Sequence, residues 1–151
     1  MPERDILDLE HFLPYRLSVL SNRISQDIAR LYADRFGLGI TEWRVLAVLG
    51  RHPGISAREV AERTAMDKVA VSRAIASLVQ AGRIARDTSG DDRRRSVLHL
   101  SPAGDAIYRE VAPLALAYQA RLVEGLGAED RAALDRLLSR MEELELATRP
   151  A

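Results

Sequence analysis

The chain has 151 residues, enough for one domain with a proper core, and 47% of them are hydrophobic and 29% charged, as is usual for a folded globular protein. It contains no cysteine, which excludes disulfides, thiolate metal sites and thiol redox sensing. No apolar run approaches the roughly 20 residues that cross a bilayer. The N-terminus is too charged for a signal peptide, so we expect a cytoplasmic protein without a membrane partner.

The formal net charge is zero, but the charges are unevenly distributed along the chain. Residues 63–95 contain eight lysines and arginines against four aspartates, so this segment carries +4 and the rest of the chain −4. Such an excess directs the segment toward phosphates, although solvated protein surface also produces an excess of this size.

Two long helical patterns open the chain. Apolar residues recur at steps of three and four over residues 13–31, which predicts one long amphipathic helix. Pro14 suits its first turn and Gly37 its end. Thr41 is predicted to be the N-cap of a second helix, which the His-Pro-Gly sequence at 52–54 ends.

Two shorter helices follow. Ser56 and Glu59 form the S-x-x-E pattern of a capping box, which opens a third helix ending near Thr64. Asp67 is predicted to cap a fourth helix that runs to Gly82. The apolar residues of this fourth helix that we expect to face inward are Val71, Ile75, Leu78 and Val79.

A β-hairpin is predicted next, with strands at residues 83–88 and 96–100 and the basic sequence Gly-Asp-Asp-Arg-Arg-Arg at its tip, residues 90–95. Two short helices followed by a basic-tipped hairpin are typical of a winged helix-turn-helix that binds duplex DNA. The second of these helices fits a major groove, and the hairpin reaches the neighbouring minor groove or the backbone.

The terminal helices carry apolar stripes longer than a compact winged helix could cover. Ser101 and Pro102 open a fifth helix, and a last helix follows the Gly-Leu-Gly sequence at 125–127. A two-fold dimer would bury these stripes and present two reading helices to a palindromic site. A monomer that folds its own ends into a bundle is the alternative.

The predicted fold class is mainly α, a winged helix-turn-helix with a small β-hairpin wing and long N- and C-terminal dimerisation helices. We expect a single domain over residues 1–151. Within it, residues 41–100 form the DNA-binding part, and residues 10–36 and 101–147 form the dimerisation helices.

Five segments carry a resemblance to a known family: 41–46 (TEWRVL), 67–73 (DKVAVSR), 78–86 (LVQAGRIAR), 92–101 (DRRRSVLHLS) and 102–104 (PAG). In this order they resemble the second helix, recognition helix, helix-to-strand passage, wing and fifth helix of the MarR (multiple antibiotic resistance regulator) family. The resemblance spans about residues 10–146. It implies a homodimeric repressor that a small ligand, often an aromatic acid or phenol, releases from DNA. The ligand would bind between the dimerisation and DNA-binding parts.

The predicted DNA contacts begin on the fourth helix. Arg73 suits bidentate pairing with guanine or a phosphate contact, and Ser72 and Lys68 suit phosphates or bases. Many relatives have Ser-Thr where this chain has Val69 and Ala70, so we expect apolar contact with thymine methyl groups there. Solvated side chains on a helix face are the alternative.

Further DNA contacts are predicted at the third helix and the wing. Ser56 and Arg58 lie at the front of the third helix, where they would clamp the DNA backbone. Asp92 and Arg94 suggest an internal pair that stiffens the hairpin, while either Arg93 or Arg94 projects to the minor groove. The candidate wing contacts are Arg93, Arg94 and Arg95.

The candidate effector-binding residues are half-polar side chains on helices that the family uses around its pocket: Tyr15, Arg16, Trp43, Tyr108 and Tyr118. Arg16 would meet a carboxylate. Core or dimer contacts are the alternative role for the aromatic residues. The resemblance implies an aromatic acid or its coenzyme A thioester as effector.

No chemistry of catalysis is visible in the sequence. His11, His52 and His99 are widely separated and share no i, i+4 helix face, so we expect no metal site. There is no phosphate-binding glycine loop and no Ser/His/Asp arrangement, so we expect no catalytic residues and no cofactor. The rival hypothesis is a winged-helix protein–protein interaction module without DNA binding, for which Arg73→Ala and Arg94→Ala would leave DNA affinity unchanged.

Overall fold

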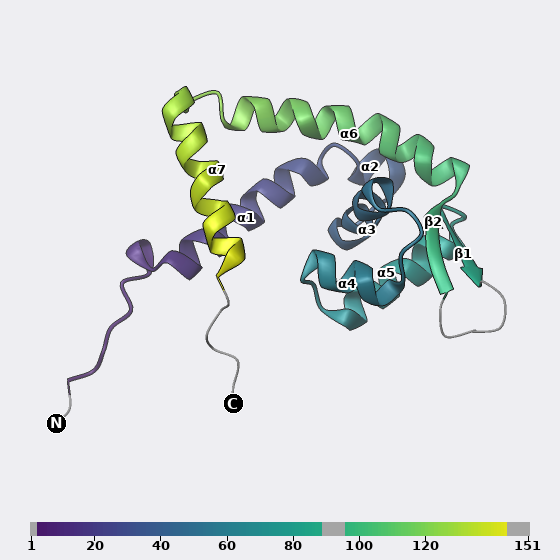
Figure 1. Cartoon of the computed structure of the whole chain (residues 1–151), viewed down its shortest axis with the longest axis horizontal. Helices are drawn as coiled ribbons and strands as arrows, with labels where there is room; N and C mark the ends of the chain where they lie inside the picture. The colour runs from purple at the N-terminus through teal and green to yellow at the C-terminus, as the bar shows by residue number, and fades with distance from the viewer. Residues whose placement is uncertain (1–2, 89–95, 145–151) are drawn as a thin grey trace. The chain divides into compact units, whose positions relative to one another are not determined.

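The computed structural model describes residues 3–88 and 96–144. It confirms a mainly helical fold with one small antiparallel hairpin (Figure 1). The chain forms two compact units, Met1–Ala115 and Leu116–Ala151. The elements in chain order are η1 (Leu9–His11), α1 (Leu13–Ala29), α2 (Ala33–Phe36), α3 (Ile40–Arg51), α4 (Ala57–Thr64), α5 (Lys68–Gln80), β1 (Ile84–Thr88), β2 (Ser96–Leu100), α6 (Pro102–Leu122) and α7 (Ala128–Glu143).

The core of the first unit is built where α3, α4, α5, the hairpin and the start of α6 meet. Its largest fully buried side chains are Tyr32, Leu46, Leu49, Ile75, Leu78, Leu98, Val45, Val60, Val71 and Val111. Complete burial of one such aliphatic side chain stabilises the fold by about 1.5–3 kcal/mol. This core fixes one face of α5 inward and leaves the opposite face at the surface.

The prediction of a single helix up to Gly37 is wrong. α1 ends at Ala29, and α2 follows as one short turn of helix. Tyr32, between them, has a non-helical backbone (φ −134°) and is only 1% exposed. The break is a tertiary effect, because the chain leaves the helical path to place this ring in the core. Gly37 does end α2, with φ 65°, in the left-handed region where glycine is favoured.

Thr41 is not the N-cap of α3, as the sequence suggested. The helix begins at Ile40, and Gly39 occupies the cap position. Glu42 Oε1 accepts a hydrogen bond from Gly39 N at 3.0 Å, which is one half of a capping box. Because this carboxylate reaches back to the helix start, the cap does not need the hydroxyl of Thr41.

The caps of α4 and α5 are confirmed. Ser56 Oγ accepts from Glu59 N at 3.1 Å, and Asp67 Oδ2 accepts from Ala70 N at 3.0 Å. In the turn between these helices Ala65 has φ 51°, the left-handed conformation that costs a residue with a Cβ about 1–2 kcal/mol. The turn therefore keeps its shape only because its surroundings hold it.

Along α5, three of the four predicted inward residues are buried: Val71, Ile75 and Leu78. The fourth prediction is wrong, because Val79 is 37% exposed. Each residue of an α-helix is rotated about 100° from the one before it. Val79 follows Leu78 by one residue and Ile75 by four, so it lies at the edge of the buried stripe and is only partly covered.

The hairpin pairs Ile84 with Leu100 and Thr88 with Ser96 in antiparallel register. β2 has its predicted bounds, but β1 begins at Ile84 rather than Arg83. Arg83 has another task, since its Nη2 donates to Phe36 O at 2.6 Å. The hairpin is tied to the chain before α4 by an isolated antiparallel bridge between Ile55 and Leu98.

α6 begins as predicted at Pro102, and Ser101 Oγ accepts from Gly104 N at 3.1 Å. Gly104 packs so tightly against the main chain of Arg83 that a Cβ at this position would collide with the carbonyl oxygen of Arg83. A glycine is therefore required where α6 leaves the hairpin.

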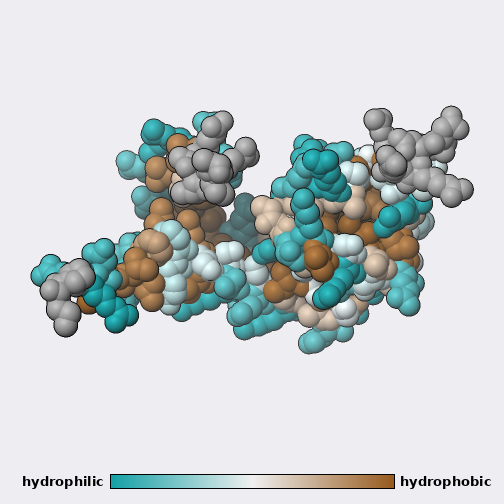
Figure 2. All heavy atoms as spheres, turned by 90° about the horizontal axis from the view of Figure 1, so that it is seen from below, coloured by the Kyte–Doolittle hydropathy of each residue, from teal (hydrophilic) through white to brown (hydrophobic). Residues whose placement is uncertain are grey.

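Several helices keep apolar side chains at the surface. On α1 these include Leu13, Leu17 and Leu20, which are 40–53% exposed, and on α7 Leu134, Leu137 and Leu138, which are 42–52% exposed. Figure 2 shows patches of hydrophobic side chains on one face of the molecule. In the described part of the chain, no helix is both long enough and apolar enough to span a membrane.

Candidate nucleic-acid interface and cavity

The outer face of α5 carries the predicted reading residues. The inward residues Val71, Ala74, Ile75 and Leu78 are buried. This rotation of the helix leaves Lys68, Val69, Ser72 and Arg73 exposed. α5 therefore presents two cations, a hydroxyl and an apolar side chain on its first two turns.

Val69 and Ala70 differ in what they offer to a base. Val69 is 56% exposed, so its methyl groups stand free at the first turn of α5. Ala70 is half-buried, and its N–H is taken by the Asp67 carboxylate. Asp67 therefore serves as the cap that the sequence predicted, and its charge is partly neutralised by the helix N-terminus.

The front of α4 lies on the same helix-turn-helix. Ser56 uses its hydroxyl as the cap of α4, and Arg58 Nε pairs with Glu62 Oε1 at 3.1 Å. This pair is exposed, and an exposed ion pair contributes little to stability. Arg58 is therefore free to exchange the carboxylate for a phosphate at small cost.

Some arginines of the basic segment, residues 63–95, already make contacts within the chain and are less available to DNA than the net charge suggested. Arg83 contributes its guanidinium to the main chain of Phe36. Arg63 Nη1 lies 3.4 Å from His52 Nε2. Partial desolvation, together with the positive charges of Arg63 and Arg51, lowers the pKa of His52. A neutral His52 accepts the hydrogen bond from Arg63.

The wing residues Asp92, Arg93, Arg94 and Arg95, which the sequence assigned to the hairpin tip, lie outside the described residues. The described strands bring the chain to this tip at Thr88 and take it up again at Ser96. Within the described residues, no three His, Asp or Glu side chains gather as metal ligands.

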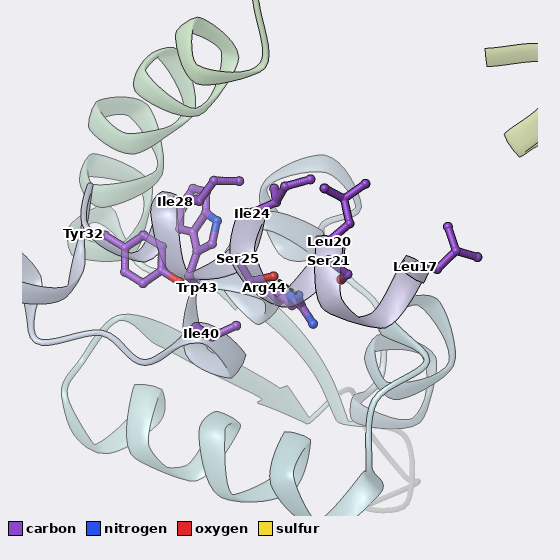
Figure 3. Close-up of a pocket in the computed structure, with 10 residues that line it drawn as sticks. All are labelled: Leu17, Leu20, Ser21, Ile24, Ser25, Ile28, Tyr32, Ile40, Trp43 and Arg44. Carbon is purple, nitrogen blue, oxygen red and sulfur yellow. Dashed lines mark hydrogen bonds between the residues drawn. The ribbon is translucent and has the colours of Figure 1, made fainter. Parts of the chain in front are cut away.

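A cavity of about 410 Å³ lies between α1 and α3 (Figure 3). Its lining is mainly apolar, with a few polar groups: Leu17, Leu20, Ser21, Ile24, Ser25, Ile28, Tyr32, Ile40, Trp43 and Arg44. An apolar lining with few polar side chains is typical of small-molecule sites.

Arg44 is the charged residue of this cavity. Its Nη2 donates to Ser25 Oγ at 2.7 Å, the bond drawn in Figure 3. Within the described part of the chain, no carboxylate forms an ion pair with this half-buried guanidinium. Burial raises the pKa of the neighbouring Tyr32, and the charge of Arg44 partly opposes that rise.

Two of the five predicted effector residues belong to one aromatic stack. Trp43 stacks between Tyr32, at a ring-centre distance of 5.5 Å, and Tyr108, at 6.3 Å. Of these three rings, Tyr32 and Trp43 line the cavity. The Tyr108 ring lies against Gly50, where a Cβ would come within 2.5 Å of Tyr108 Cε2.

The other three predicted effector residues are not brought to this cavity by the first unit. Tyr15 and Arg16 lie on the first turn of α1 and do not line the cavity, and Tyr118 belongs to the second unit. The sequence reasoning missed Tyr32 and Arg44. One signal was present for Arg44, since an arginine next to Trp43 interrupts an otherwise apolar helix face.

Comparison with known proteins gives consistent matches. The family model described as the MarR family matches residues 36–95. A putative transcriptional regulatory protein for the hcr operon of Thauera aromatica is 32% identical over 79 residues, 52% of this chain and 48% of that protein, so the match spans about half of that relative. An HTH-type transcriptional repressor of Mycobacterium tuberculosis is 27% identical over 131 residues, 86% of this chain and 91% of the repressor.

Solved structures match over almost the whole chain. A MarR/EmrR family regulator from Acinetobacter sp. ADP1 has a TM-score of 0.82 at 24% identity, covering 90% of this chain and 96% of the other. The repressor CouR bound to a 23-mer DNA duplex has a TM-score of 0.76 at 26% identity, covering 93% and 99%. NadR in complex with 4-hydroxyphenylacetate has a TM-score of 0.76 at 19% identity, covering 96% and 100%.

These matches agree with the capped helix-turn-helix, the antiparallel hairpin and the exposed basic face of α5. The relatives are transcriptional regulators and not enzymes, and they include a DNA-bound repressor. Over residues 36–95 the chain matches the MarR family model, and the relatives that it resembles are transcriptional regulators.

Proposed function

We propose that this protein is a homodimeric repressor that holds a palindromic operator through α5 of each protomer. The observation that carries this proposal is the exposed face of α5, with Lys68, Ser72 and Arg73 beside the free methyl groups of Val69. Arginine matches the paired acceptors of guanine, and an apolar side chain matches the thymine methyl group. The similarity to CouR, which was solved on duplex DNA, supports this mode of binding.

Dimerisation supplies the second half of the proposal. A fold that leaves leucines of α1 and α7 about half exposed needs a partner surface, because large apolar patches on monomers are uncommon. A second copy of the chain provides it by two-fold symmetry. The same symmetry sets two reading helices about one DNA turn apart, which matches a palindromic site.

The cavity is the proposed effector site. Its half-buried Arg44 has no carboxylate partner in the described residues, so an incoming carboxylate would gain a charge-assisted hydrogen bond. The apolar wall and the ring of Trp43 suit an aromatic body. The solved complex of NadR with an aromatic acid supports this choice. Between the two predicted effector classes we propose the free acid, because thioester formation removes the carboxylate that would pair with Arg44 beside the aromatic ring.

The experiment selects operator sequences from random duplex DNA with the wild-type protein and then compares affinities by fluorescence anisotropy. Arg73→Ala should lower affinity about 5- to 150-fold, equivalent to about 1–3 kcal/mol, and relax the preference for one base. The matched control Arg136→Ala, an exposed arginine of α7, should leave affinity unchanged. Affinity should also fall steeply with salt as counterions are released.

The rival hypothesis of a protein–protein interaction module makes the opposite forecast. It requires that wild-type protein enriches no sequence from the random pool and that Arg73→Ala changes nothing. Either result would refute DNA binding through α5.

A further inference from the structure

Arg44, on α3, contacts both α1 and the turn of the helix-turn-helix. Its Nη2 donates to Ser25 Oγ of α1 at 2.7 Å, and its Nη1 lies 3.8 Å from Met66 Sδ in the turn between α4 and α5. The same side chain lines the cavity. The Arg44 guanidinium therefore contacts both α1 and the turn that precedes α5, while it also lines the cavity.

The turn that receives this contact contains a strained residue. Met66 stands between Ala65, which has the left-handed φ of 51°, and Asp67, whose carboxylate caps α5 through Ala70 N. A left-handed residue with a Cβ is strained and is kept in place by neighbouring contacts. Met66 also packs against the buried core and is itself half-buried. The contact from Arg44 is thus one of the supports of the turn that sets the start of α5.

We propose that Arg44 is a positioning residue that couples occupation of the cavity to the start of α5. This inference rests on the proposed effector site and adds how that site would act on DNA binding. A thioether is a weak hydrogen-bond acceptor, whereas a carboxylate forms a charge-assisted, bidentate pair with arginine. A carboxylate that binds in the cavity therefore draws the guanidinium away from Met66 Sδ, and the strained turn loses one of the contacts that hold it in place.

Two reporters separate binding from coupling. Trp43 is the single tryptophan of the chain and lines the cavity, so its fluorescence reports occupation. The chain has three methionines, so labelling their methyl groups with ¹³C gives three NMR signals, and Met66→Leu assigns the one from the turn. The probes are benzoate, salicylate and 4-hydroxyphenylacetate, each compared with its uncharged amide.

The acid that quenches Trp43 should also shift the Met66 methyl signal, and its amide should not. The same acid should lower wild-type affinity for the selected operator about 5- to 150-fold, the usual range for coupled sites. In Met66→Leu this ratio should fall to about twofold or less, since the turn has lost the acceptor that the acid competes against. Each variant is compared with its own acid-free affinity, so a general loss of stability cancels.

Met141→Leu makes the same exchange on α7 and should keep the wild-type ratio. Quenching of Trp43 with an unmoved Met66 signal, or a full ratio in Met66→Leu, would overturn the coupling while leaving the effector site intact. If none of the three acids changes Trp43 fluorescence, the aromatic-acid site itself is refuted and the coupling with it.

Discussion

The winged-helix part and the terminal helices differ in how completely their apolar side chains are buried. Around α3, α4, α5 and the hairpin, the leucines and valines that face inward are buried almost completely, and the two helices of the helix-turn-helix carry side-chain caps. Along α1 and α7 the leucines remain about half exposed, and neither helix has a side-chain cap. The first region is covered within one chain, whereas the proposed dimer would cover the second.

This contrast separates two kinds of constraint on the sequence. In the winged-helix part, the residue types are constrained by contacts within the same chain, such as that of Gly104 with Arg83. In the terminal helices, the leucines lie at the surface of the chain, where the proposed dimer would cover them. Substitutions in the winged-helix part should therefore lower the stability of the fold, whereas substitutions in the terminal helices should impair assembly.

The largest effect is expected on the exposed apolar face of α7. Leu137→Glu places a carboxylate where the proposed dimer buries a leucine, and an unpaired buried charge costs several kcal/mol. Sedimentation should show a monomer, and operator affinity should fall more than about 100-fold, since only one reading helix remains per particle.

Ser139→Glu adds the same charge to the same helix on the side away from the leucines, and it should leave the dimer intact. A Leu137→Glu protein that sediments like the wild type would show that α7 is no part of the dimer, and the contrast between the two regions would then need another explanation.

A smaller effect, on stability rather than assembly, is expected at Gly104. Gly104→Ala forces a methyl group onto the carbonyl of Arg83, and overpacking of this kind costs typically about 1–3 kcal/mol. Urea unfolding should show the loss. Gly125→Ala is the matched control, since a Cβ there meets nothing within 4 Å. Equal stabilities for the two variants would mean that α6 does not pack closely on the hairpin.

The smallest of the three effects is expected at the cap of α5. Asp67→Ala removes the acceptor for Ala70 N and should lower the free energy of unfolding by about 1 kcal/mol. Asp135→Ala, in the middle of exposed α7, should change it far less. Indistinguishable urea midpoints for Asp67→Ala and wild type would show that the cap contributes nothing to folding.

The sequence predicted local features best. The caps at Ser56 and Asp67 and the bounds of β2 follow from patterns a few residues long, and the structure confirms them. Thr41 was misjudged although its competitor, Glu42, is the next residue, because either side chain suits the start of a helix. The break after α1 was missed because it depends on the burial of Tyr32 by residues distant in sequence.

The site followed the same rule. The outward face of α5 could be predicted from helical periodicity, and the structure places Lys68, Val69, Ser72 and Arg73 at the surface. The cavity could not, because Arg44 acquires its role from contacts 19 and 22 residues away along the chain. Such contacts exist only once α1, α3 and the turn before α5 have packed together.

The most direct test of the central claim is the stoichiometry of the complex with selected operator DNA. Sedimentation of wild-type protein with a fluorescent duplex should give two protomers per duplex, and halving the palindrome should reduce affinity steeply. One protomer per duplex, with equal affinity for the half-site, would contradict an account in which two copies of α5 read the DNA together.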